Sequence, residues 1–121
     1  MKVRYIVTIA VFCSASAASA SMNAQLFYAK AVALEKKGMG AMLSKDLKPV
    51  MNEMKASGAA VKAENEAAKK LGSPLYCPPA KSGSMNSKQL LALFGAIPES
   101  RRKTINVQTA WKEILVKKFP C

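Results

Sequence analysis

The chain has few cysteines and no histidine, and this limits the chemistry open to it. Without histidine there is no Ser-His or Cys-His pair to activate a nucleophile. Two or three cysteines alone supply no convincing set of zinc ligands. We find no phosphate-binding loop, dinucleotide-binding glycine motif or calcium-loop spacing. The sequence therefore predicts a protein that is not an enzyme and that holds no cofactor or metal.

Residues 1–20 have the pattern of a secretory signal peptide. Lys2 and Arg4 precede an apolar run over residues 5–13, and Ala18-Ser19-Ala20 provides a cleavage site of small residues. A membrane anchor is the alternative, but the run has about half of the ~20 residues that a bilayer requires. We expect export to the periplasm, a mature chain that begins near Ser21, and no integral membrane segment after cleavage.

The cysteines that remain after such cleavage are Cys77 and Cys121. Two cysteines in an exported chain are most simply explained by one disulfide bond, although a free thiol and an intermolecular bridge are the alternatives. By the chain-entropy argument, closing a loop of this size contributes ~4 kcal/mol to stability. The bond would fasten the last helix to the loop "LYCPP".

The remainder of the chain has the apolar periodicity of helices and no alternating strand pattern of useful length. Residues 72–86 form a connection rich in proline, glycine and serine. We expect an all-α fold: one domain over residues 21–121, built as a bundle of four or five helices and stapled by one disulfide. The expected helix caps are Asn23 or Ser21, Ser44 or Asp46, Asn86 or Ser84, and Asn106.

Several residues have expected places in this bundle. Met51 and Met54 lie on the apolar stripe of the longest helix and are expected to fill the core. Trp111 is expected to anchor the last helix in that core. Gly58, in the middle of the longest helix, marks either a close approach of another helix or a tolerated weakness.

The chain is strongly basic, with a net charge of +12. Four lysines, Lys48, Lys55, Lys62 and Lys69, recur every seven residues and form one row along the longest helix. This row either docks an anionic partner or is a solvated face whose side chains cover the apolar stripe. A second cluster, Arg101-Arg102-Lys103, lies in an expected linker where the side chains are free to reach a partner. Nucleic acid is an unsuitable partner, because the chain is exported and lacks interleaved aromatic residues.

The second half of the chain resembles the end of the Tai-type immunity proteins, periplasmic proteins associated with type VI secretion. The resemblance runs from "YCPP" through "QLLALF", "IPESRR" and "TAWKEIL" to "KKFPC". The front half departs from the family, because it is rich in lysine and alanine and lacks the family's cysteines. The matching positions are Cys77, Pro79, Gln89, Leu90, Pro98, Glu99, Arg101, Ala110, Leu115, Pro120 and Cys121.

This resemblance implies a small helical protein that binds a secreted cell-wall amidase effector and occludes its active site, and members of the family are often homodimers. No catalytic residue is expected in such an inhibitor. The alternative function is that of a basic helical protein that binds the cell wall or an anionic membrane surface. A weaker third possibility is a small periplasmic chaperone. Binding measured at increasing salt concentration distinguishes the amidase inhibitor from the surface-binding protein, since binding by diffuse charge is lost as screening increases.

Overall fold

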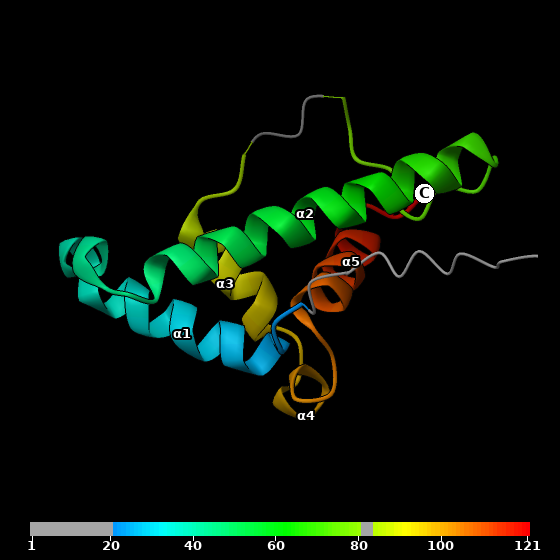
Figure 1. Ribbon diagram of the computed structural model, residues 1–121. Coiled ribbons are helices and arrows are strands. Elements are labelled where there is room, and N and C mark those ends of the chain that lie inside the picture. Colours follow the sequence, from blue (N-terminus) through cyan, green and yellow to red (C-terminus); the bar gives the residue numbers. More distant parts are fainter. Residues whose placement is uncertain (1–20, 81–83) are drawn as a thin grey trace, which may run out of the picture.

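The computed structural model describes residues 21–80 and 84–121, so the predicted signal peptide lies outside the described residues. The described part contains five α-helices, one 3-10 helix and no strand, which confirms the predicted all-α fold. The elements are α1 (Ala24–Lys37), η1 (Gly38–Leu43), α2 (Leu47–Lys70), α3 (Ser87–Gly95), α4 (Glu99–Arg102) and α5 (Val107–Lys118). In Figure 1, α2 spans the length of the bundle, with α1 along its first half and α5 against its second half.

Asparagine side chains cap the N-termini of three of the helices, as the sequence predicts. Asn23 Oδ1 accepts hydrogen bonds from the first turn of α1, and Asn106 Oδ1 accepts one from the Thr109 amide at 2.8 Å. Asn86 and Gln89 form a reciprocal capping box at the start of α3. Helix α2 differs, because Asp46 occupies the cap position without a side-chain hydrogen bond.

The starts of α1 and α5 are joined by a short antiparallel contact. The Ala24 amide donates to the Ile105 carbonyl at 2.9 Å, and the Val107 amide donates to the Met22 carbonyl at 2.8 Å. These two bonds make an isolated bridge between Asn23 and Asn106. The backbone groups that precede the two helices thus satisfy each other, which fixes where both helices begin.

Aromatic rings connect three helices in the core. Phe27 of α1 lies 5.1 Å from Phe94 of α3 between ring centroids, and Phe94 lies 6.2 Å from Trp111 of α5 in a nearly parallel stack. Trp111 is buried, which confirms its predicted role as a core anchor. Helix α2 packs against α5, and Val61 of α2 and Val107 of α5 are fully buried.

The Cys77–Cys121 disulfide is present, with the two Cα atoms 4.9 Å apart. The chain on either side of it is also held by hydrogen bonds. Asn65 of α2 donates to the Tyr76 carbonyl at 3.0 Å and accepts from the Leu75 amide at 2.8 Å. The Cys77 amide donates to the Phe119 carbonyl at 2.8 Å. Burial, aided by Glu66, raises the pKa of the Tyr76 phenol, so this ring stays neutral beside the bond.

We predict that the double variant Cys77→Ser/Cys121→Ser of the protein beginning at Ser21 loses up to ~4 kcal/mol of unfolding free energy. The reason is that the open chain regains the conformational freedom of a 44-residue loop. Urea denaturation followed by circular dichroism measures the loss. Unchanged stability, or two alkylated thiols in the native protein, would show that the bond has no structural role.

Gly58 does not mark a close helix approach. A Cβ atom built at this position meets nothing within 4 Å, and Gly58 is helical. The sequence left two explanations open, and this geometry supports a tolerated weakness in α2. Glycine here only adds freedom to the unfolded chain.

We predict that Gly58→Ala raises the unfolding free energy by about 0.5–1 kcal/mol, because alanine restricts the unfolded chain and fits the helix without a clash. The matched control is Ala59→Gly at the next, exposed position of α2, which should lower it by a similar amount. The same denaturation experiment checks both. A destabilised Gly58→Ala protein would contradict the open environment described above.

Candidate functional site

The four lysines of the predicted row are all exposed on α2. None of them makes an ion pair with another described residue. The ion pairs within residues 21–80 and 84–121 use other cations: Lys30 with Asp46, Lys103 with Glu99, Lys112 with Glu64, and Arg101 with Glu113. The row of Lys48, Lys55, Lys62 and Lys69 is therefore positive charge that the described part of the protein leaves uncompensated.

The second basic cluster is not a free linker, which corrects the sequence-based prediction. Arg101 and Arg102 end the short helix α4, and Lys103 follows it. Arg101 is half exposed and hydrogen-bonds Glu113 of α5, which raises the pKa of the guanidinium. Lys103 pairs with Glu99 one turn earlier at 3.4 Å. Two of the three side chains thus remain accessible, but each already has an acidic neighbour.

Arg102 is buried, with 7% of its surface exposed, so the prediction that it reaches a partner is wrong. Its Nη1 atom donates to the carbonyls of Phe94, Gly95 and Ile97, at or just beyond the end of α3. These carbonyls lie at the negative end of the helix dipole, where a helix leaves its last carbonyls without i+4 amide donors. Arg102 therefore caps the C-terminus of α3, and its side chain is not exposed for contact with a partner protein.

Helix α1 completes the environment of this arginine. Arg102 Nε donates to Gln25 Oε1 at 2.7 Å, and its guanidinium lies 4.3 Å from the centre of the Tyr28 ring. Gly95 permits the close packing, because a Cβ there would lie 2.9 Å from the Tyr28 hydroxyl. The positive charge is thus stabilised by carbonyl dipoles, an amide oxygen and an aromatic face.

We predict that Arg102→Gln lowers the unfolding free energy by about 2–4 kcal/mol, since it removes several charge-assisted hydrogen bonds from a buried side chain. Arg101→Gln is the matched control, and its effect should be far smaller because the pair with Glu113 is exposed. Thermal and urea unfolding of the two variants test this difference. Equal effects would contradict the structural role of Arg102.

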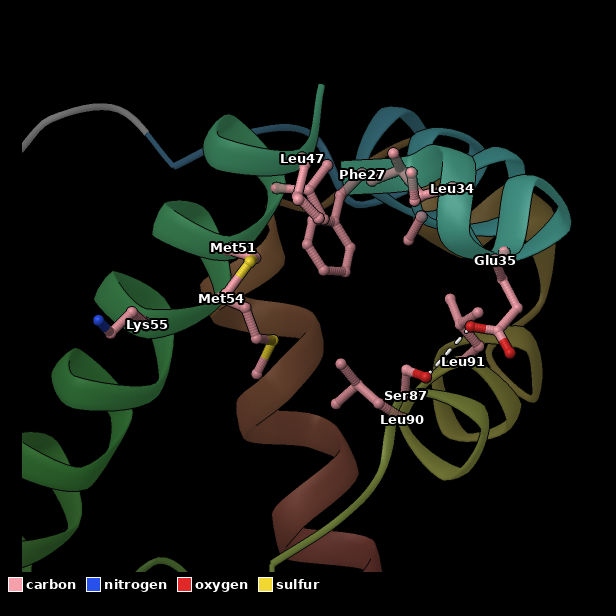
Figure 2. Close-up of a pocket in the computed structure, with 14 residues that line it drawn as sticks. Phe27, Leu34, Glu35, Leu47, Met51, Met54, Lys55, Ser87, Leu90 and Leu91 are labelled. Atoms are coloured by element: carbon pink, nitrogen blue, oxygen red, sulfur yellow. Dashed lines mark hydrogen bonds between the residues drawn. The ribbon is translucent and has the colours of Figure 1, made fainter. Parts of the chain in front are cut away.

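An apolar groove lies between α1, η1, α2 and α3. Its volume is about 550 Å³. Figure 2 shows the side chains of Phe27, Met54 and Leu90 turned toward one another across it, from three different helices. The apolar residues that line it are Phe27, Ala31, Leu34, Ala41, Leu47, Val50, Met51, Met54, Leu90 and Leu91.

Polar groups lie at the margin of the groove. Glu35 Oε2 accepts a hydrogen bond from the Ser87 hydroxyl at 3.1 Å, which joins α1 to the first turn of α3. Lys55 lines the opposite side, and its amine points away from the apolar side chains (Figure 2). Lys55 belongs to the lysine row and is the member of that row that lines the groove.

The groove modifies the expectation that both methionines fill the core. Met54 is partly buried against the core, as expected. Met51 is 54% exposed and stands at the opening of the groove. Periodicity predicts which face of α2 is apolar, but it does not show how far α3 lies from that face. The only sequence signal for a groove is the presence of adaptable methionines one turn apart.

A smaller cavity of about 380 Å³ lies between the end of α3, α4 and α5. Leu93, Ile97 and Ile114 provide apolar walls, and the Arg101–Glu113 pair lies at its margin. Lys117 and Lys118 also line this cavity, so it has positive charge at its margin as the groove does, but its volume is the smaller of the two.

The described residues show no arrangement suited to metal chemistry. In residues 21–80 and 84–121, no three His, Cys, Asp or Glu side chains gather where they could hold a metal ion. None of the helices in this part is at once long enough and apolar enough to span a bilayer. Comparisons with protein-family models, with curated proteins and with solved structures gave no match for this chain.

Proposed function

We propose that this protein acts by binding, as a periplasmic immunity protein that uses the apolar groove to hold a secreted cell-wall amidase effector and occlude its active site. The observation that carries the proposal is the groove itself, an open apolar concavity with Lys55, which is in no described ion pair, at one edge. The choice of an amidase rests on the resemblance of residues 77–121 to the Tai-type immunity proteins. The exported location rests on the signal-peptide pattern of residues 1–20.

The groove has the composition of a protein-binding site. A buried apolar centre with a polar margin is the usual arrangement of a specific interface, and the anchors in such a centre provide most of the affinity. Methionine side chains at Met51 and Met54 can adapt to the shape of an inserted group. The lysine row adds attraction for an acidic effector and would increase its rate of association.

Inhibition by this route needs no catalytic group on the protein. The inhibitor only has to place its surface over the substrate cleft of the amidase and remain there. The apolar contacts then determine the dissociation rate, and the lysines mainly affect the association rate. Such binding should persist at salt concentrations that abolish attraction between exposed charges.

We predict that oxidised protein beginning at Ser21 captures a cell-wall amidase from periplasmic and secreted extract at about 0.3 M salt, and inhibits it at one-to-one stoichiometry. Met51→Glu should weaken inhibition by roughly a hundredfold, because a carboxylate would be desolvated at the groove opening. The matched control is Val116→Glu on α5, which is similarly exposed but does not line the groove.

Two results would overturn the proposal. One is the absence of any amidase among the proteins retained at this salt concentration. The other is equal inhibition by Met51→Glu and the unsubstituted protein, which would place the interface elsewhere. Circular dichroism of each variant confirms that the comparison is made between folded proteins.

A further inference from the structure

The 3-10 helix η1 exposes three large apolar side chains at one end of the molecule. Met39 is 91% exposed, Met42 76% and Leu43 92%. They lie in the turn from α1 to α2, which projects at the end of the bundle opposite the disulfide (Figure 1). Adjacent, almost fully exposed apolar residues are uncommon on a soluble surface unless they contact something.

Lysines lie on both sides of this apolar tip. Lys36 and Lys37 end α1, and Lys45 and Lys48 follow η1 at the start of α2, all exposed. Of the nearest acidic side chains, Asp46 already pairs with Lys30 at 3.5 Å, and Glu35 accepts a hydrogen bond from Ser87 but keeps its negative charge. The four lysines outnumber this one carboxylate, so the apolar tip carries a net positive charge around it.

We propose that η1 inserts into the surface of an anionic phospholipid bilayer. Met39, Met42 and Leu43 would enter the boundary between headgroups and acyl chains, and the lysines would contact lipid phosphates. Apolar insertion combined with electrostatic attraction is how proteins without a spanning segment bind membranes. Insertion to such a depth needs only a short element, in keeping with the six residues of η1.

A bilayer suits this tip better than an acidic protein does. The three side chains project from a convex turn, and a protein partner would need a matching cavity to bury them. A bilayer needs no such match, because acyl chains rearrange around an inserted side chain. The concave groove and the convex tip therefore suit different partners, and this inference does not rest on the proposed amidase.

The two sites are nonetheless neighbours. Gly38 and Ala41 of η1 line the groove, whereas Met39, Met42 and Leu43 do not. Insertion of the tip would thus leave the α2 and α3 walls of the groove outside the bilayer. The structure assigns membrane contact and partner contact to adjacent, separate surfaces.

The first test is co-sedimentation of the oxidised protein with phosphatidylcholine vesicles, with or without about one-third phosphatidylglycerol. We expect binding only to the anionic vesicles. The triple variant Met39→Ser/Met42→Ser/Leu43→Ser should lose binding by roughly tenfold or more. Leu71→Ser is the matched control, because Leu71 is 85% exposed but lies at the other end of α2. Undiminished binding by the triple variant would overturn the proposal.

A second pair of variants tests where the charge acts. Each lysine near the bilayer should strengthen binding about fivefold, so Lys45→Gln/Lys48→Gln should weaken it about 25-fold. Lys62→Gln/Lys69→Gln removes the same charge from the distant half of α2 and should have little effect. Equal losses would mean attraction to total charge without insertion of η1.

Fluorescence tests insertion directly. Leu43→Trp should shift its emission to shorter wavelength on anionic vesicles, whereas Leu71→Trp should not, and buried Trp111 gives a common background. An unshifted Leu43→Trp spectrum on bound protein would overturn the proposal. Met51→Glu should still bind vesicles, so a failure of the amidase experiment and a failure of this one are distinguishable.

Discussion

The guanidinium of Arg102 binds the carbonyl oxygens at the end of α3 and at the same time contacts Gln25 and Tyr28 of α1. Helix α3 has nine residues, too few to be stable alone, so its position depends on what its ends and its apolar face contact. Asn86 satisfies the amides at one end and Arg102 the carbonyls at the other. Because α3 forms one wall of the groove and carries Phe94 into the core, both depend on this contact.

The protein has two kinds of positive charge, one buried with fixed acceptors and one exposed. Arg102 is enclosed and has fixed acceptors, so its charge contributes to the fold and is hidden from a partner. The lysines of α2 and of the η1 tip are exposed and are in none of the ion pairs of the described part of the chain. Composition counts these side chains together, whereas only the second group can attract a ligand from solution.

Much of the fold could be predicted from the sequence because its determinants are local or few. A side chain such as Asn106 caps the residues directly after it, and after residue 21 only one cysteine pair is possible. The role of Arg102 could not be predicted, since its acceptors belong to another helix end and a basic triplet has the same sequence whether exposed or buried. The groove depends on the distance between α2 and α3, which no periodicity encodes, and Met51 was accordingly expected in the core.

The bridge between Asn23 and Asn106 also has a consequence for the order of folding. The first helix is held at its start by residues that are synthesised more than eighty positions later, as the Asn23–Ile105 contact shows. Contacts so distant in sequence form late and slow the folding of small domains. A chain emerging from the ribosome therefore cannot complete this fold until nearly all of it has been made. For the export proposed above, this delay would keep the chain unfolded until it is translocated.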